Sequence, residues 1–191
     1  MSLVVIKEDG TGRVDANSYA SWADGDAYFA GHAYPTPWVF QITQYAASPE
    51  PALVMATRLI DAYCRFDGFK KTVGQALQWP RQAVVDREAD FGVAGVGLVR
   101  QAWPVGPGYL SADTVPACVV LATCEMAREL LAVDRTGAPL GEGLKSSSVS
   151  GSTFVFDRLA RRPVLTPTVI ALLSRVLKGS PNGASVPLRR A

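Results

Sequence analysis

Apolar residues recur at spacings of three and four in two long stretches of the chain, which is the spacing of one buried helix face. The first stretch follows Ser48-Pro49-Glu50 and carries the apolar residues Leu53, Ala56, Leu59, Ile60, Tyr63 and Cys64. The second runs from Pro116 to about Val133, with an inward stripe of Val119, Ala122, Met126, Leu130 and Val133. The pattern predicts two core helices, the first with the outward residues Arg58, Asp61 and Arg65.

Two shorter helices are predicted from the residues that start them. Ser18 or Ser21 can cap a helix that ends near residue 30, and Asp24 follows Ser21 at the spacing of a capping box. The last helix, residues 168–177, opens at Thr166 and is so apolar that other parts of the protein must cover it.

Segments rich in turn-forming residues separate these helices. Residues 67–113 contain ten glycines and prolines and form a long loop excursion, and residues 137–152 are a glycine- and serine-rich flexible loop. Residues 153–156 alternate like a strand. We therefore predict a mainly α protein with short β segments and extended termini. A single domain over residues 1–178 holds a small bundle of about four helices, and residues 179–191 form a C-terminal arm.

Composition narrows the class of protein. The 191 residues are 48% hydrophobic and 19% charged, which excludes a wholly disordered chain. No apolar run approaches the roughly 18 residues that span a bilayer, and the N-terminus lacks a signal-peptide pattern, so we expect a cytoplasmic protein without membrane contact. The three cysteines form no C-x-x-C pair, and we expect buried, reduced thiols.

The net charge of +2 is unevenly distributed. From residue 158 to the end there are seven basic residues and no acidic one, so the preceding 157 residues carry −5. This asymmetry favours an anionic partner for the C-terminal part, either an acidic protein face or nucleic acid. A basic tail that serves only solubility is the alternative.

The sequence contains no motif that is typical of a catalytic, metal or cofactor site. His32 is the single histidine and stands at a predicted helix end. The glycines of 92–97 and 141–146 do not fit the spacing of phosphate-binding loops. A calcium loop is likewise incomplete around the alternating carboxylates Asp86, Glu88 and Asp90. We expect a binding or assembly protein rather than an enzyme, with no cofactor or metal.

A cluster in the long loop is the candidate for nucleic-acid contact. Lys70 and Lys71 lie near Trp79 and Arg81, and single strands are held by positive charge together with aromatic stacking. The alternative is that Trp79-Pro80 folds back onto the helices as a hydrophobic latch.

Six short segments carry a family resemblance through their order and spacing: Glu8–Gly12, Asp15–Tyr19, Ala27–Phe29, Ala56–Asp61, Gln75–Arg81 and Val115-Pro116. Over roughly residues 8–133 the chain resembles the DnaT-like single-stranded DNA-binding proteins found among the head and neck genes of tailed bacteriophages. The resemblance implies a head-to-tail adaptor, or connector. Such a virion protein forms a ring of twelve subunits beneath the portal and joins the filled head to the tail or the next neck protein.

The resemblance also suggests partners and contact residues. Double-stranded DNA would pass through the ring without specific binding, and the protein would reside in the virion neck, or in the host cytoplasm during assembly. Because adaptors dock onto the portal through the C-terminal helix and tail, the expected portal contacts are Arg161, Arg162, Arg175, Lys178, Leu188, Arg189 and Arg190. The loop residues Lys70, Lys71, Trp79 and Arg81 would contact neighbouring subunits. In the alternative function, a single-stranded DNA-binding replication accessory protein, they would contact DNA.

Overall fold

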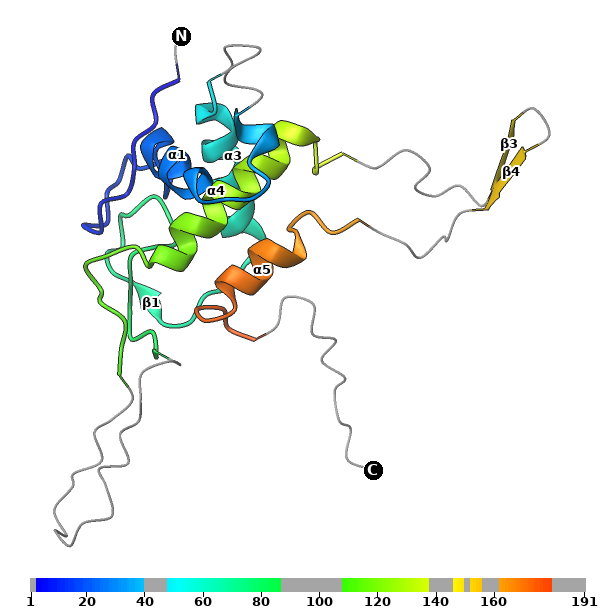
Figure 1. The fold of residues 1–191 in the computed structure, drawn as a ribbon. Helices are drawn as coiled ribbons and strands as arrows, with labels where there is room; N and C mark the ends of the chain where they lie inside the picture. The colour runs from blue at the N-terminus through cyan, green and yellow to red at the C-terminus, as the bar shows by residue number, and fades with distance from the viewer. Residues whose placement is uncertain are drawn as a thin grey trace, which may run out of the picture.

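A computed structural model describes residues 3–39, 48–86, 108–137, 146–149, 152–155 and 162–179 of the chain. Within them the helices are α1 (Trp22–Ala30), α3 (Glu50–Tyr63), α4 (Ala117–Ala132) and α5 (Pro167–Leu173). The described strands are short: β1 (Phe69–Lys70), β2 (Arg81–Gln82), β3 (Ser146–Val149) and β4 (Ser152–Val155). The mainly α class with short β segments is confirmed (Figure 1).

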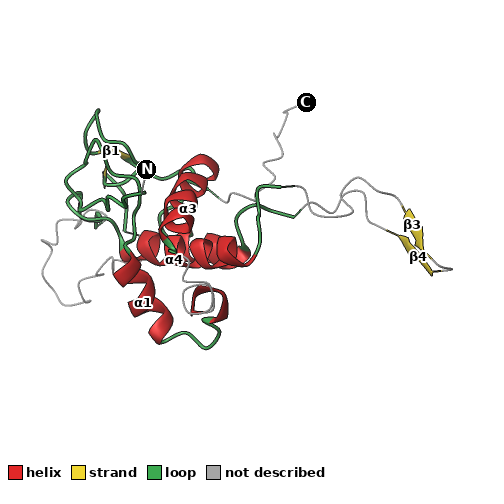
Figure 2. Cartoon of the chain, turned by 90° about the horizontal axis from the view of Figure 1, so that it is seen from above, coloured by secondary structure: helices red, strands yellow, loops and turns green. Residues whose placement is uncertain are grey.

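Helix α4 is the centre of the helical body. It packs against α1, α3 and α5, and Figure 2 shows it crossing among the other helices. Val119, Ala122 and Met126 of its predicted stripe are fully buried, and burial of one large apolar side chain contributes about 1.5–3 kcal/mol. The prediction fails at Val133, which follows the helix and is 42% exposed.

Helix α1 begins with the predicted capping box. The hydroxyl of Ser21 accepts a hydrogen bond from the backbone N–H of Asp24, and the Asp24 carboxylate accepts one from the backbone N–H of Ser21. Gly25 faces the indole of Trp38 so closely that an added Cβ would lie 2.3 Å from Cζ2 of that ring. Glycine at this position therefore lets the segment after α1 fold back against the helix.

The predicted exposure of two residues on α3 is wrong. Tyr63, predicted in the core, is 56% exposed, whereas Asp61, predicted to face solvent, turns inward to bind Tyr19 and Gln78. The loop after β1 covers the Asp61 side of the helix, a long-range contact that helical spacing does not reveal. Pro49 occupies the N-cap position of α3, and the Ser48 hydroxyl accepts a hydrogen bond from the backbone N–H of Glu50 at 3.3 Å.

The last helix is shorter than predicted. Thr166 caps it as expected, but it ends at Leu173 rather than at residue 177. Residues 176–178 instead run antiparallel to residues 65–67, with a bridge between Phe66 and Leu177. This pairing joins the ends of α3 and α5.

Both described sheets are two-stranded and antiparallel. β1 pairs with β2 inside the predicted loop excursion, of which residues 87–107 lie outside the described part. β3 pairs with β4 in a hairpin, which confirms the strand predicted near residue 153 and places a second strand inside the segment predicted as a flexible loop. Of the predicted C-terminal arm only Gly179 is described. Within the described part, no helix has the length and apolar character needed to cross a membrane.

Candidate nucleic-acid interface

A buried tyrosine and a carboxylate attach the candidate DNA-contact loop to α3. The hydroxyl of Tyr19 donates a hydrogen bond to Asp61 Oδ1 at 2.5 Å and accepts bonds from the backbone N–H groups of Gln78 and Trp79 at 3.0 and 3.1 Å. Asp61 Oδ2 accepts a second bond from Gln78 N–H at 3.0 Å. Burial raises the pKa of Asp61, although its hydrogen bonds oppose this effect, and burial beside Asp61 raises the pKa of Tyr19.

Trp79 is part of the core. Its side chain is fully buried and meets the Phe66 ring edge-on, with 5.7 Å between ring centroids. The latch alternative is therefore confirmed. An indole without exposed surface cannot stack on a nucleic-acid base, so Trp79 is not a contact residue in this conformation.

Arg81 also has a structural role. It is 8% exposed, and its guanidinium donates to the backbone carbonyls of Phe66, Asp67, Gly68 and Gln78, at distances from 2.7 to 3.4 Å. Burial lowers the pKa of Arg81. These bonds close the turn that contains β1 and β2. They also occupy the guanidinium N–H groups that would otherwise bind a phosphate.

The two lysines of the loop differ. Lys71 Nζ donates to the Gly10 carbonyl at 2.9 Å and pairs with Asp113 at 2.6 Å, so it links the loop to the N-terminal segment and to the approach to α4. Lys70 is exposed, and its Nζ lies 3.5 Å from the Gln75 carbonyl. Beside it Phe69 is 74% exposed. Of the four predicted loop contacts, Lys70 alone presents its charge to solvent.

The N-terminal loop folds around a buried carboxylate. Glu8 is 1% exposed, and its oxygens accept bonds from the N–H groups of Gly10, Gly12 and Arg13 at 2.9–3.0 Å. A cleft of about 380 Å³ adjoins this loop and is lined by Lys7, Glu8, Asp9, Thr114, Val115 and Val120. Lys7 pairs with Asp24 at 2.7 Å, so neither Lys7 nor Glu8 is free to hold a ligand there.

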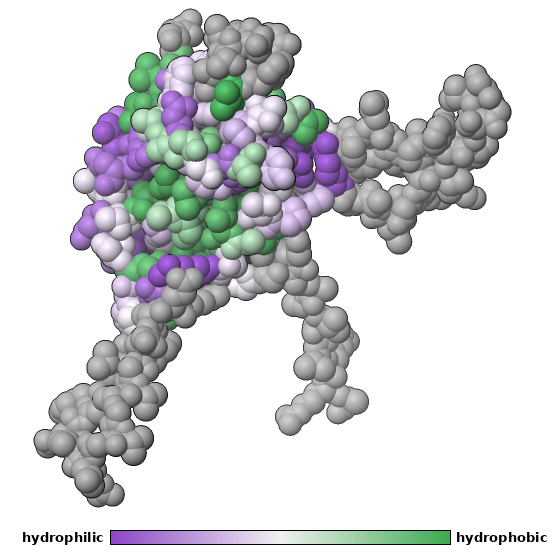
Figure 3. Space-filling model, viewed as in Figure 1, coloured by the Kyte–Doolittle hydropathy of each residue, from purple (hydrophilic) through white to green (hydrophobic). Residues whose placement is uncertain are grey.

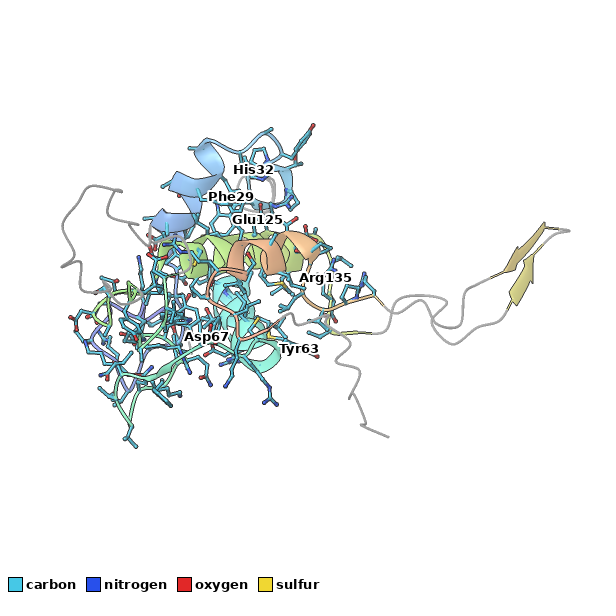
Figure 4. All side chains as sticks on the ribbon, turned by 90° about the horizontal axis from the view of Figure 1, so that it is seen from below. Phe29, His32, Tyr63, Asp67, Glu125 and Arg135 are labelled. Carbon is cyan, nitrogen blue, oxygen red and sulfur yellow. The ribbon has the colours of Figure 1, made fainter. Side chains whose placement is uncertain are left out.

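His32 belongs to a structural cluster on the other side of the body. The Tyr34 N–H donates to His32 Nδ1 at 3.0 Å, and His32 Nε2 faces Glu125 Oε1 at 3.1 Å. The buried Glu125 carboxylate also accepts bonds from Tyr28 and Arg128 at 3.1 and 2.8 Å. Figure 4 shows His32 and Glu125 facing one another across α1 and α4. The predicted helix-terminal role of His32 therefore includes fastening α1 to α4.

The described part contains no metal-binding cluster. No group of three or more histidine, cysteine, aspartate or glutamate side chains is placed to hold an ion there. None of the three cysteines forms a disulfide bond, and Cys64 and Cys124 are buried as expected, whereas Cys118 is half-buried. Burial raises the pKa of Cys64 and of Cys124 to about 12, so both remain thiols at neutral pH.

The predicted portal contacts divide into internal and exposed residues. Arg162 donates to the Asp134 carbonyl at 2.6 Å, and Arg175 pairs with Asp86 at 2.7 Å. Lys178 is exposed, with no hydrogen bond or ion pair from its ammonium group to the described residues. The remaining predicted contacts lie outside the described residues: Arg161, Leu188, Arg189 and Arg190.

Comparison with known proteins gives one family. Residues 1–96 match the model of the family described as "Putative DnaT-like ssDNA binding protein", a match that spans α1, α3 and the loop with β1 and β2, just over half of the chain. No curated protein and no solved structure matches the chain. The family description agrees with the alternative function of single-stranded DNA binding, and it does not refer to a phage connector. The chain belongs to this DnaT-like family.

Proposed function

We propose that this protein binds single-stranded DNA without sequence preference, as an accessory of DNA replication, and that it acts by binding rather than by catalysis. The family match over residues 1–96 is the observation that carries the proposal. Proteins of this functional class combine basic side chains, which follow the phosphates, with aromatic rings on which unpaired bases stack. The described residues include both kinds of group at the surface, for example the basic side chain of Lys178 and the ring of Tyr63.

The buried polar contacts support this function indirectly. Tyr19, Asp61 and Arg81 fix the loop on α3 without using the exposed groups. Because these bonds are formed inside the protein, the surface groups do not have to reorganise when a ligand binds, and the entropic cost of binding is lower.

Fluorescence anisotropy with labelled oligonucleotides tests this proposal. We expect the full chain to bind an oligo-dT strand more tightly than a duplex of equal length, because stacking requires unpaired bases. The affinity should also fall with increasing salt, since bound cations release counterions from the strand. Absence of binding to either form at 50 mM salt would exclude the function.

A second candidate is the head-to-tail adaptor of a tailed phage, with the portal protein, further copies of this chain and the next neck protein as partners. It is favoured by an apolar area on the face over α4 (Figure 3). The helix leaves Val120, Leu121 and Leu131 only half-buried, and apolar surface of this kind is typical of protein contacts. In a ring this face would lie against a neighbouring subunit.

Negative-stain imaging distinguishes the two candidates. An adaptor should form rings, alone or on its portal, and should lose portal attachment when residues 179–191 are deleted. A replication accessory protein should show neither rings nor portal-capping density. Rings together with the absence of single-stranded DNA binding would decide for the adaptor.

A further inference from the structure

The ends of α3 and α5 meet in a short antiparallel pairing. The N–H of Lys178 donates to the Arg65 carbonyl at 2.8 Å, and the N–H of Asp67 donates to the Val176 carbonyl at 3.1 Å. Between these two bonds lie Phe66 and Leu177, which are 6% and 2% exposed.

This pairing brings two positive charges together at the surface. Because Phe66 pairs with Leu177, Arg65 stands opposite Lys178. Both residues are exposed. Like charges opposite one another on paired strands are unfavourable for the fold. The pairing of these two positive charges therefore does not stabilise the fold, and an anionic ligand bound between them would reduce their repulsion.

Arg58 extends the positive surface along α3. It lies on the exposed side of the helix, five residues before Tyr63, the last residue of α3, which corresponds to roughly 7.5 Å along the helix axis. Two acidic groups, Asp61 and Asp67, lie near this surface in the sequence. Asp61 binds Tyr19 and Gln78 inside the protein, and the charge of Asp67 acts on Arg81, whose pKa it raises against the effect of burial.

Arg58, Arg65 and Lys178 differ from the other described basic residues in their hydrogen bonding. Within the described residues, every other lysine or arginine donates to at least one acceptor from its side chain: Lys7, Arg13, Lys70, Lys71, Arg81, Arg128, Arg135, Arg162 and Arg175. Arg58, Arg65 and Lys178 have no such bond to a described residue. The described basic side chains without such a bond therefore all lie on α3 or on the two segments that pair after α3 and α5.

An aromatic ring accompanies these charges. Tyr63 is the last residue of α3 and is 56% exposed. In Figure 4 it lies at the free end of α3, on the opposite side of α4 from Phe29 and His32. Tyr63 stands two residues before Arg65 in the chain. Exposed rings together with basic side chains are the combination on which a single strand stacks while its phosphates are neutralised.

We propose that Arg58, Tyr63, Arg65 and Lys178 form the contact surface for single-stranded DNA, in place of the loop residues that sequence suggests. This surface, here called the α3-end surface, rests on the proposed DNA-binding function and gives it a location. Arg58, Arg65 and Lys178 contact phosphates, and the Tyr63 ring stacks on a base. Duplex DNA lacks free base faces, so it gains only the phosphate contacts and binds more weakly.

Charge removal tests the location. The double variant Arg65→Gln/Lys178→Gln should bind oligo-dT more weakly, and its salt slope, d log K/d log[salt], should be smaller in magnitude by about 1.4, or 0.7 for each lost phosphate contact. Lys70→Gln is the matched control, because Lys70 is an exposed lysine of the predicted loop. We expect its slope to equal that of the wild type. Far-UV circular dichroism confirms that each variant is folded.

Substitution of the ring tests the stacking contact. Tyr63→Ala should weaken binding about fivefold or more, whereas Tyr63→Phe should keep it, because the ring and not the hydroxyl contacts the base. Two results would overturn the α3-end surface and leave the DNA-binding function intact. The double variant could bind oligo-dT as tightly as the wild type, or Lys70→Gln could weaken binding instead. Absence of binding by the wild type would overturn both.

Discussion

At the scale of single residues, the position of Trp79 depends on the contact between Tyr19 and Asp61. The latch is one of two sequence-based predictions for Trp79, and the structure confirms it. The prediction that Asp61 lies outside the core is wrong, because helical spacing describes one helix and contains no information about a loop seventeen residues further on. The roles of Lys71 and Arg81 could not be predicted for the same reason, since Arg81 binds mainly backbone carbonyls and Lys71 binds the Gly10 carbonyl and the distant Asp113, none of which a residue pattern marks.

Tyr19→Phe tests this contact. Loss of the hydroxyl removes the donor to Asp61 and the acceptor for Gln78 and Trp79, so the free energy of unfolding should fall by about 1–3 kcal/mol in urea denaturation. Tyr34→Phe is the control, because the Tyr34 side chain is 75% exposed, and it should change stability little. Equal stability of the two variants would contradict the structural role of Tyr19.

The same variant has a defined pH dependence. The hydrogen bond from Tyr19 lowers the pKa of Asp61, which burial raises above its ordinary value of 3.8, so its loss raises that pKa further. An acid with a raised pKa in the folded state binds more protons folded than unfolded, and stability then falls as pH rises through that interval. The deficit of Tyr19→Phe should therefore grow as pH increases above 3.8. A deficit that shrinks with rising pH would show that Asp61 is not involved.

At the scale of elements, spacing and capping signals identified the helices, while contacts between elements set their ends. Ser21 and Asp24 start α1 as predicted, because a capping box is local in sequence. Helix α5 ends before residue 177 because the following segment pairs with residues 65–67, and that pairing is remote in sequence. Sequence likewise placed Arg58 and Arg65 on the outer side of α3 but could not show that Lys178 lies beside Arg65.

The N-terminal loop shows how closely such elements approach one another. Gly10 has φ +96°, and a Cβ added there would lie 2.0 Å from the Asp113 carbonyl oxygen. Gly10→Ala should lower the free energy of unfolding by about 1–3 kcal/mol, because both the backbone strain and the clash oppose it. Gly31→Ala, where nothing lies within 4 Å of the added Cβ, is the control for thermal denaturation. A melting temperature for Gly10→Ala at or above that of the control would contradict the described packing.

At the scale of the whole molecule, the proposed DNA binding depends on which basic side chains have no partner within the folded chain. The uneven charge of the sequence favours the basic C-terminal region as the ligand contact, but Arg162 and Arg175 have partners within the chain. The family match favours DNA as the ligand, and the available charges of the described residues gather at the α3-end surface. Composition alone could not show which basic side chains have hydrogen-bond or ion-pair partners, because these contacts form only in the folded chain.

An NMR titration of the ¹⁵N-labelled full chain with oligo-dT tests the central claim most directly. We predict chemical-shift changes that saturate with added strand and centre on residues 58–65 and 176–178, while the amides of residues 71–81 change little. Shifts confined to residues 69–82 would contradict the α3-end surface. A spectrum that oligo-dT leaves unchanged at 50 mM salt would contradict single-stranded DNA binding itself.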